Sequence, residues 1–229
     1  MLTQRHNAAS RILENGDRLT REEFERRYAA MPNLKKAELI EGVVYMAAAL
    51  RYRLHGNPHS YVLAWLGLYA AHTPGVEPAD NTTVRLDDRN APQPDALLRL
   101  EAGGQSWISE DDYVEGAPEL IVEIAASTAS YDLYDKLQVY RRNAVQEYLV
   151  WLVEDRELRW YSLENGEYVV QQPDAAGLIR SRCFPGLWLA VKALLAGQMA
   201  EVLAAQQAGL DSEEHGAFIA RLNSLEASS

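Results

Sequence analysis

Apolar positions along the chain recur with two periods, which separates expected helices from expected strands. Helical spacing begins after Thr20, a typical N-cap followed by Glu22 and Glu23, and it ends at Pro32. The same spacing recurs over 59–71 and 131–143. After Leu187 it continues to Leu225, with a break near Gly209. The pattern therefore predicts helices over 20–33, 59–71, 131–143 and 187–225.

Runs rich in β-branched and aromatic residues predict the strands. Glu41-Gly42 and Asn165-Gly166 separate two such pairs of runs and predict hairpins. The expected strands are 38–40, 43–46, 81–86, 95–99, 119–125, 147–153, 156–162 and 168–172. The run 119–125 is interrupted only by Glu119 and Glu123, as expected for a strand buried on both faces. We expect one α/β domain over 1–195 and a C-terminal helical extension over 196–229.

Composition and charge narrow the function classes. The 229 residues are 48% hydrophobic and contain one cysteine, Cys183, so neither a disulfide nor a cysteine-based zinc site is expected. The first residues are polar, and the apolar stretch 61–71 is too short to span a bilayer, so we expect a cytoplasmic protein without membrane contact. A net charge of −11 argues against a protein that coats nucleic acid, although local basic surfaces remain compatible with it.

Four charged residues stand within or beside apolar strands, where burial is costly unless the charges are paired or bind a cation. Glu38 begins one strand, Asp95 follows Pro94, and Glu123 interrupts an apolar run. Lys136 lies in the helix that follows the strand of Glu123. Three carboxylates that converge with one lysine form a site of hard oxygen ligands, which Mg²⁺ prefers. Asp95 and Glu123 are the candidate metal ligands for phosphodiester hydrolysis, and Lys136 is a candidate catalytic charge.

The order and spacing of several short motifs over about residues 18–195 resemble the Uma-type family of endonuclease-like proteins in the PD-(D/E)XK restriction-endonuclease-like superfamily. The central motifs are Gln93-Pro94-Asp95, Pro118-Glu119-Leu120-Ile121-Val122-Glu123-Ile124, Ser127-Thr128, Asp132-Leu133 and Lys136-Leu137. The similarity continues through Glu38-Leu39-Ile40-Glu41-Gly42, His59, Tyr140, Val145-Gln146-Glu147-Tyr148, Val150-Trp151 and Pro185-Gly186-Leu187-Trp188-Leu189.

The resemblance implies a mixed β-sheet flanked by helices, with the acidic residues gathered at one edge. It implies a Mg²⁺-dependent endonuclease acting on DNA, with Mn²⁺ as a possible substitute, and by analogy of fold a homodimer. Asp95 and Glu123 then correspond to the two acidic residues of the superfamily, and Glu38 adds a third carboxylate at the metal. The usual lysine position falls on Ala125, and Lys136 in the following helix takes its place.

Each residue also has a purely structural interpretation. Asp95 is compatible with a turn or cap, Glu123 with a solvent-facing edge strand, and Asp132 with Lys136 as a surface ion pair one helical turn apart. His59 is expected to cap or pack at the start of its helix, and the basic N-terminal region to be either a solvated face or a DNA-facing surface. The alternative function is a non-catalytic protein of the same fold that binds a partner or itself.

Overall fold

The computed structural model describes residues 12–46, 49–126 and 132–227. Its centre is a six-stranded mixed sheet in the order β11-β10-β9-β8-β5-β3. Only β8 and β9 run parallel to each other, and all other neighbours in this sheet are antiparallel. The strands are β3 (Val76–Asp80), β5 (Ala96–Leu100), β8 (Leu120–Ala125), β9 (Glu147–Leu152), β10 (Glu157–Glu164) and β11 (Glu167–Val170).

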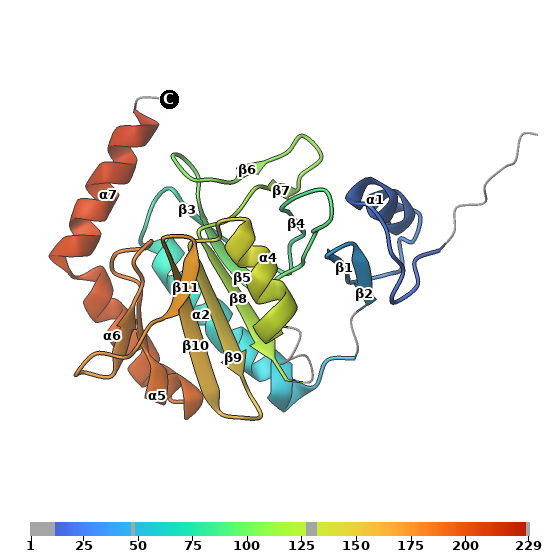
Figure 1. Cartoon of the computed structure of the whole chain (residues 1–229). Helices are drawn as coiled ribbons and strands as arrows, with labels where there is room; N and C mark the ends of the chain where they lie inside the picture. Colours follow the sequence, from blue (N-terminus) through green and yellow to red (C-terminus); the bar gives the residue numbers. More distant parts are fainter. Residues whose placement is uncertain (1–11, 47–48, 127–131, 228–229) are drawn as a thin grey trace, which may run out of the picture.

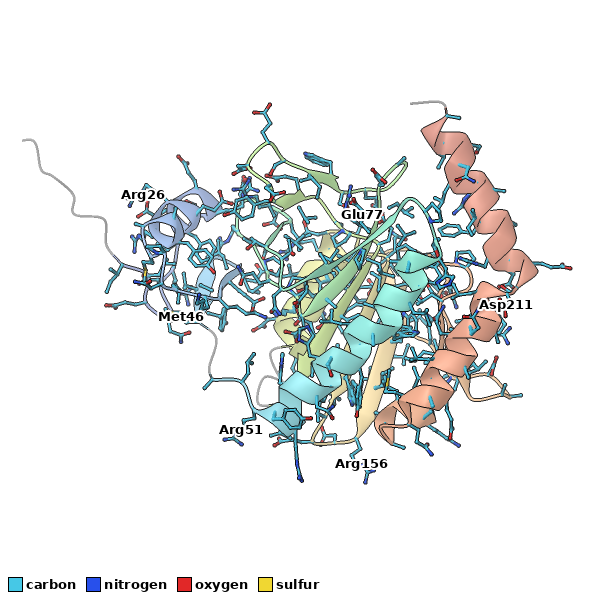
Figure 2. The ribbon with its side chains drawn as sticks, turned by 180° about the vertical axis from the view of Figure 1, so that it is seen from behind. Arg26, Met46, Arg51, Glu77, Arg156 and Asp211 are labelled. Carbon is cyan, nitrogen blue, oxygen red and sulfur yellow. The ribbon has the colours of Figure 1, made fainter. Side chains whose placement is uncertain are left out.

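Helices cover both faces of this main sheet, so the fold has three layers (Figure 1). One face packs against α4 (Leu137–Arg142), which follows the short π-helical segment η2 (Asp132–Lys136) in the connection between β8 and β9. The opposite face packs against α2 (Asn57–Ala71), which Figure 2 shows in front of the sheet. The segment η1 (Tyr52–Gly56) leads directly into α2.

The N-terminal part forms a smaller unit beside the main sheet. Its elements are α1 (Arg21–Ala29), β1 (Ala37–Ile40) and β2 (Val43–Met46), which surround their own apolar cluster with Phe24 and Leu39 at its centre. Thr20 caps α1 as expected, because its Oγ1 accepts a hydrogen bond from the backbone N–H of Glu23. The predicted hairpin is confirmed: Glu41 and Gly42 both have positive φ, as a tight two-residue turn requires.

Three short strands and a final hairpin complete the sheet structure. The first group pairs in the order β4-β7-β6, and the hairpin pairs β12 with β13. Their bounds are β4 (Val84–Arg85), β6 (Trp107–Ile108), β7 (Val114–Glu115), β12 (Leu178–Arg180) and β13 (Trp188–Ala190).

The C-terminal helices pack on the face of the main sheet that α2 covers. They are α5 (Val191–Leu195), α6 (Met199–Leu210) and α7 (Glu213–Glu226). Val202, Leu210, Phe218 and Leu222 belong to the same apolar cluster as α2 and the sheet. The buried Gln206 of α6 accepts a hydrogen bond from Trp65 Nε1 at 2.9 Å, which ties α6 to α2. None of the helices in the described ranges is long and apolar enough to cross a membrane.

Most of the expected elements are present, but the strand predicted over 81–86 is confined to β4, and β3, β6, β7 and β12 were not predicted. The expected helix from Leu187 begins with a strand, β13, because a short apolar run after a Pro-Gly turn has no period that distinguishes strand from helix. Strand β3 was not expected because it contains Pro78, which is accommodated at the edge of the sheet. The expected helix 131–143 begins, in the described residues, as η2, and residue 131 lies outside them.

Candidate active site

Glu123 lies on β8, and Asp95 directly precedes the neighbouring strand β5. Ala96 pairs with Val122 in the antiparallel β5–β8 register, which places Asp95 across from Glu123. The Asp95 carboxylate accepts a hydrogen bond of 2.8 Å at Oδ2 from the backbone N–H of Ile124. This bond fixes the Asp95 side chain to the strand that carries Glu123. Asp95 lies at a bend immediately before β5, as the turn interpretation expects, and its carboxylate is buried against β8.

Glu123 points toward the helical connection between β8 and β9. Its Oε1 accepts hydrogen bonds of 2.8 Å from both Lys136 Nζ and the hydroxyl of Tyr140. Only 3% of the residue is exposed, because β8 lies between β5 and β9 in the interior of the sheet. The interpretation of Glu123 as a solvent-facing edge residue is therefore wrong.

Lys136 joins two carboxylates that are distant in sequence. Its Nζ lies 2.9 Å from Glu38 Oε1 in addition to its contact with Glu123. Glu38 Oε1 also accepts a hydrogen bond of 2.7 Å from the backbone N–H of Gln93. Lys136 is 3% exposed, so it is a buried charge among acidic groups, and the interpretation as a surface residue is wrong.

Lys36 and His55 lie against Asp95. Asp95 Oδ1 lies 3.2 Å from Lys36 Nζ and 3.1 Å from His55 Nε2. Burial favours the protonated acid, but the hydrogen bond from His55, the charges of Lys36 and His55, and the Ile124 N–H together hold the pKa of Asp95 well below its usual range. Burial likewise disfavours the charged form of Lys36, yet the charges of Asp95, Glu38 and Glu123 raise its pKa. Asp95 is thus held as a carboxylate.

His59 supports this arrangement from the first turn of α2. Its Nε2 lies 2.7 Å from the backbone carbonyl oxygen of Asp95 and 3.1 Å from Asp80 Oδ1. The expected position at the start of its helix is confirmed. Since its contact is with the main chain of Asp95, His59 positions the strand that carries the carboxylate.

The chemistry of the cluster suits a divalent cation, although its side chains do not enclose one point. Asp95, Glu123 and Glu38 supply the hard oxygen donors that Mg²⁺ and Mn²⁺ accept. Within the described residues, no three acidic, histidine or cysteine side chains converge as a ready-made metal site. The ammonium groups of Lys36 and Lys136 stand between the carboxylates in that arrangement. A metal ion would compete with these cations for the same oxygens.

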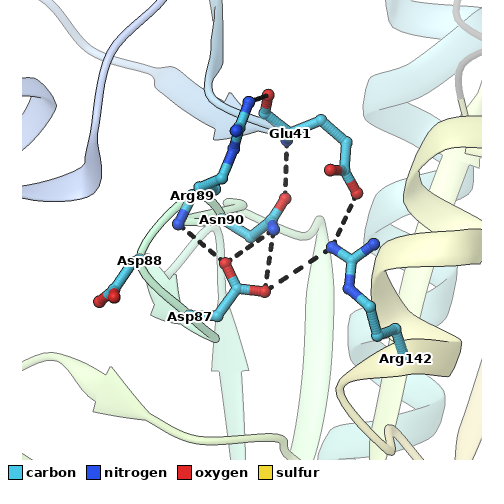
Figure 3. A pocket seen from close by; sticks show the side chains of 6 residues that line it. All are labelled: Glu41, Asp87, Asp88, Arg89, Asn90 and Arg142. Carbon is cyan, nitrogen blue, oxygen red and sulfur yellow. Dashed lines mark hydrogen bonds and ion pairs between the residues drawn. The ribbon is translucent and has the colours of Figure 1, made fainter.

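A separate hollow of about 480 Å³ lies at the far end of α4, where the β1–β2 turn approaches Arg142 (Figure 3). Arg142 forms an ion pair of 2.7 Å with Glu41, and Asn90 donates from Nδ2 to Asp87 Oδ1 at 2.8 Å. The Arg89 side chain donates to the carbonyl oxygen of Glu41. These opposite charges satisfy one another, and we interpret the hollow as the joint that holds the hairpin of Glu38 against α4.

A comparison with known protein families identifies the family of this chain. The family model Uma2, described as "Putative restriction endonuclease", matches residues 21–192, which is well over half of the chain. The chain belongs to the Uma2 family. No match was found among proteins of curated function.

The solved structures agree with this family at the level of the fold. The chain is similar to a protein from Anabaena variabilis ATCC 29413 described as a putative nuclease belonging to DUF820, with a TM-score of 0.57 and 15% sequence identity. The similarity covers 75% of this chain and 96% of that one. At this identity the match supports the mixed sheet flanked by helices that the Uma2 resemblance implies, and nothing finer.

Three residues of the site were missed by the sequence-based prediction of this Uma2 chain: Lys36, His55 and Tyr140. Each lies on the same face of its extended or helical segment as a residue that the sequence had indicated, namely Glu38, His59 or Lys136. Lys36 precedes Glu38 by two residues in extended chain, while His55 precedes His59 by four and Tyr140 follows Lys136 by four in helical chain. Periodicity places each of the three on the face of its named neighbour, but it does not show which carboxylate the side chain reaches.

Proposed function

We propose that the protein is a metal-dependent endonuclease that hydrolyses phosphodiester bonds of DNA. The observation that carries the proposal is the buried cluster in which Lys136 joins Glu123 to Glu38, while the Asp95 carboxylate is bound to the strand of Glu123. Burying three carboxylates and two ammonium groups is costly, and replacement by apolar side chains is often neutral or favourable for stability. A functional requirement for these charges explains why they are present.

In this proposal Asp95 and Glu123, assisted by Glu38, hold Mg²⁺ or Mn²⁺. When bound, the ion supplies positive charge at a phosphate oxygen and lowers the pKa of a water molecule. Lys136 places a second positive charge where the phosphate develops negative charge, and Glu38 and Glu123 fix its position. Tyr140 holds Glu123 Oε1 through its hydroxyl, and His55 holds Asp95 Oδ1, so that both carboxylates keep their orientation.

The test is cleavage of supercoiled, linear and single-stranded DNA with Mg²⁺ or Mn²⁺ by the wild type, Asp95→Asn and Glu123→Gln. Both variants preserve side-chain shape, and circular dichroism checks that they fold. Glu22→Gln is the matched control, because Glu22 is an exposed carboxylate outside the cluster. We expect cleavage by the wild type and the control only, and none in the presence of a chelator. Equal activity of all four proteins would refute the assignment.

One observation favours a second function, that of a non-catalytic member of the family that binds a partner or itself. Lys36 and Lys136 already form ion pairs with the carboxylates of the cluster, as a purely structural set of charges would require. This alternative predicts a folded protein that binds no divalent ion and cleaves no DNA.

We also propose that the protein acts as a homodimer, since duplex cleavage needs two cuts and the edge strand β11 exposes Val169 and Val170. Light scattering after size-exclusion chromatography gives the mass of the species in solution. A monomer at all concentrations would refute this part of the proposal.

A further inference from the structure

A groove of about 400 Å³ lies beside the candidate active site, on the face of the sheet that α2 covers. Its walls are the start of α2, the end of β9, the β9–β10 turn and the turn between α5 and α6. Its lining residues include Arg53, Asn57, Tyr61, Trp151, Arg156 and Gly197.

The groove adjoins Asp95 through two shared elements. Trp151 lies opposite Ile124 in the parallel register of β8 and β9, and neighbouring strands are about 4.8 Å apart. The backbone N–H of Ile124 is the group that binds the Asp95 carboxylate. His59, which contacts the main chain of Asp95, lies on the first turn of α2 between groove residues Asn57 and Tyr61. Asp95 and Glu123 face the α4 side of the sheet, and the groove lies on the α2 side. The segment η1 connects the two around the strand ends, because it carries both His55, which contacts Asp95 Oδ1, and the groove residue Arg53.

The charge of the groove is opposite to that of the chain as a whole. Its only charged lining residues are Arg53 and Arg156, and both are exposed. Neither forms an ion pair in the part of the chain that the structure describes, and the same holds for the exposed Arg51 nearby. Figure 2 shows Arg51 and Arg156 at the same end of the molecule, near the start of α2. Glu154 and Asp155 precede Arg156 in its turn but do not line the groove.

The basic N-terminal region, which was the expected alternative for DNA contact, differs in this respect. Arg21 pairs with Glu115 at 3.1 Å, Arg26 with Glu23 at 2.7 Å, and Arg27 also with Glu23 at 2.6 Å. Carboxylates neutralise these three guanidinium groups, whereas Arg53 and Arg156 at the groove are open to a phosphate.

We propose that the groove binds a nucleotide of an unpaired DNA strand that extends from the site of cleavage, an inference that rests on the proposed nuclease function. Arg53 and Arg156 contact the phosphates, and the half-buried ring of Tyr61 stacks on the base. The volume lies within the range of about 300–1,000 Å³ for pockets that hold one small molecule, which suits one nucleotide and not a duplex. The substrate class is therefore DNA with a single-stranded tail or a frayed end.

Binding is measured by fluorescence anisotropy with a labelled single strand, a duplex with a single-stranded tail and a blunt duplex, all in chelator so that no cleavage occurs. We compare the wild type with Arg53→Ala/Arg156→Ala, and with Arg18→Ala/Arg221→Ala as a control of equal charge. Arg18 and Arg221 are also exposed and without a carboxylate partner in the described chain. Tyr61→Ala and Tyr61→Phe test the ring.

We expect the tailed duplex to bind more tightly than the blunt one. In the groove variant the slope of log K against log salt concentration for the single strand falls by about 1.4, since each phosphate contact contributes about 0.7. Tyr61→Ala weakens binding of the single strand by about fivefold or more, which corresponds to about 1 kcal/mol of stacking. Tyr61→Phe keeps the ring and therefore binds like the wild type. Equal binding of tailed and blunt duplexes, or a groove variant that behaves like the control, overturns the inference.

Cleavage of supercoiled DNA by the wild type and Glu123→Gln is measured in parallel to separate the two proposals. A wild type that cleaves, with groove variants that bind normally, rejects the groove and keeps the nuclease. A wild type that binds the tail through Arg53 and Arg156 but cleaves nothing rejects the nuclease and keeps the groove as a binding site.

Discussion

Lys136 Nζ lies 2.9 Å from Glu38 Oε1, and this contact links the N-terminal hairpin to the helical connection that covers the main sheet. The same ammonium group lies 2.8 Å from Glu123 Oε1. One buried cation thus holds together carboxylates from two sheets. The contact determines both the stability of the cluster and the position of the proposed catalytic charge.

Lys136→Met leaves Glu38 and Glu123 buried without their shared cation. We expect the free energy of unfolding to fall by about 3–5 kcal/mol, the usual cost of removing one partner of a buried ion pair. Urea unfolding at neutral pH measures it, with Lys35→Met, an exposed lysine, as control. Adding Glu123→Gln to Lys136→Met should recover part of the loss, since one uncompensated charge is removed. A loss below about 1 kcal/mol in the single variant would contradict this role.

Millimolar Mg²⁺ or Mn²⁺ should raise the melting temperature of the wild type. Binding to the native state alone stabilises it by about 2.7 kcal/mol when the ion is at one hundred times its dissociation constant. The effect should disappear in Asp95→Asn and Glu123→Gln and persist in Glu22→Gln. Calorimetry with and without metal provides the measurement, and an equal shift in all four proteins would place the ion elsewhere.

Glu147 is a second buried carboxylate, away from the proposed site. It is fully buried, and its oxygens accept hydrogen bonds from Ser181 Oγ at 2.6 Å and from the backbone N–H of Arg182 at 2.7 Å. Burial raises the pKa of Glu147 above its ordinary value of 4.5, and these hydrogen bonds offset the effect only in part.

The native state therefore retains a proton that the unfolded chain releases. As pH rises above the unfolded value near 4.5, stability falls until the folded pKa is passed. Glu147→Gln has no carboxyl group to titrate, so its stability should not fall in this way. The unfolding free energy of the variant should therefore rise relative to that of the wild type as pH increases from about 4.5 to the folded pKa. Urea titrations at several pH values test it. A constant difference across the range would show that Glu147 titrates alike in both states.

The boundary expected at residue 195 stays a prediction, and truncation tests it. Removing residues 199–229 would expose the apolar cluster that Val202 and Phe218 cover and would leave Trp65 Nε1 without Gln206. Since the loss of each large buried side chain costs about 2–5 kcal/mol, we expect the truncated chain to be unfolded or molten. A cooperative melting transition near that of the full chain would show that the C-terminal helices are an independent extension.

The sequence predicts the helices and strands that have a strong hydrophobic period, and it predicts the charged residues within them. It does not predict elements whose type depends on contacts with distant parts of the chain. The run around Glu123 indicates a buried strand because apolar residues flank it on both sides, and its position between two strands bears this out. By contrast, β13 is a strand because β12 supplies its hydrogen-bond partner, which the local pattern of Trp188–Ala190 does not contain.

The same limit applies to the site. Single positions such as Asp95 were identified because a carboxylate in an apolar strand is costly. Lys36 and His55 were not, because each lies in a polar segment where a charge is ordinary, and only the folded chain brings them to Asp95. The partner of a buried charge is fixed by long-range strand order, which no local pattern specifies.

The parallel pairing of β8 with β9 has a consequence for the order of folding. Parallel neighbours cannot be joined by a tight turn, so the chain must leave the sheet and return, and the segment that does so carries Lys136 and Tyr140. Until β9 docks, this segment lacks the packing that β9 supplies, including the contact of Tyr140 with Tyr148. Nascent chains that end before β9 is complete are therefore expected to lack the assembled cluster, and its formation should follow the slow, long-range closure of the sheet.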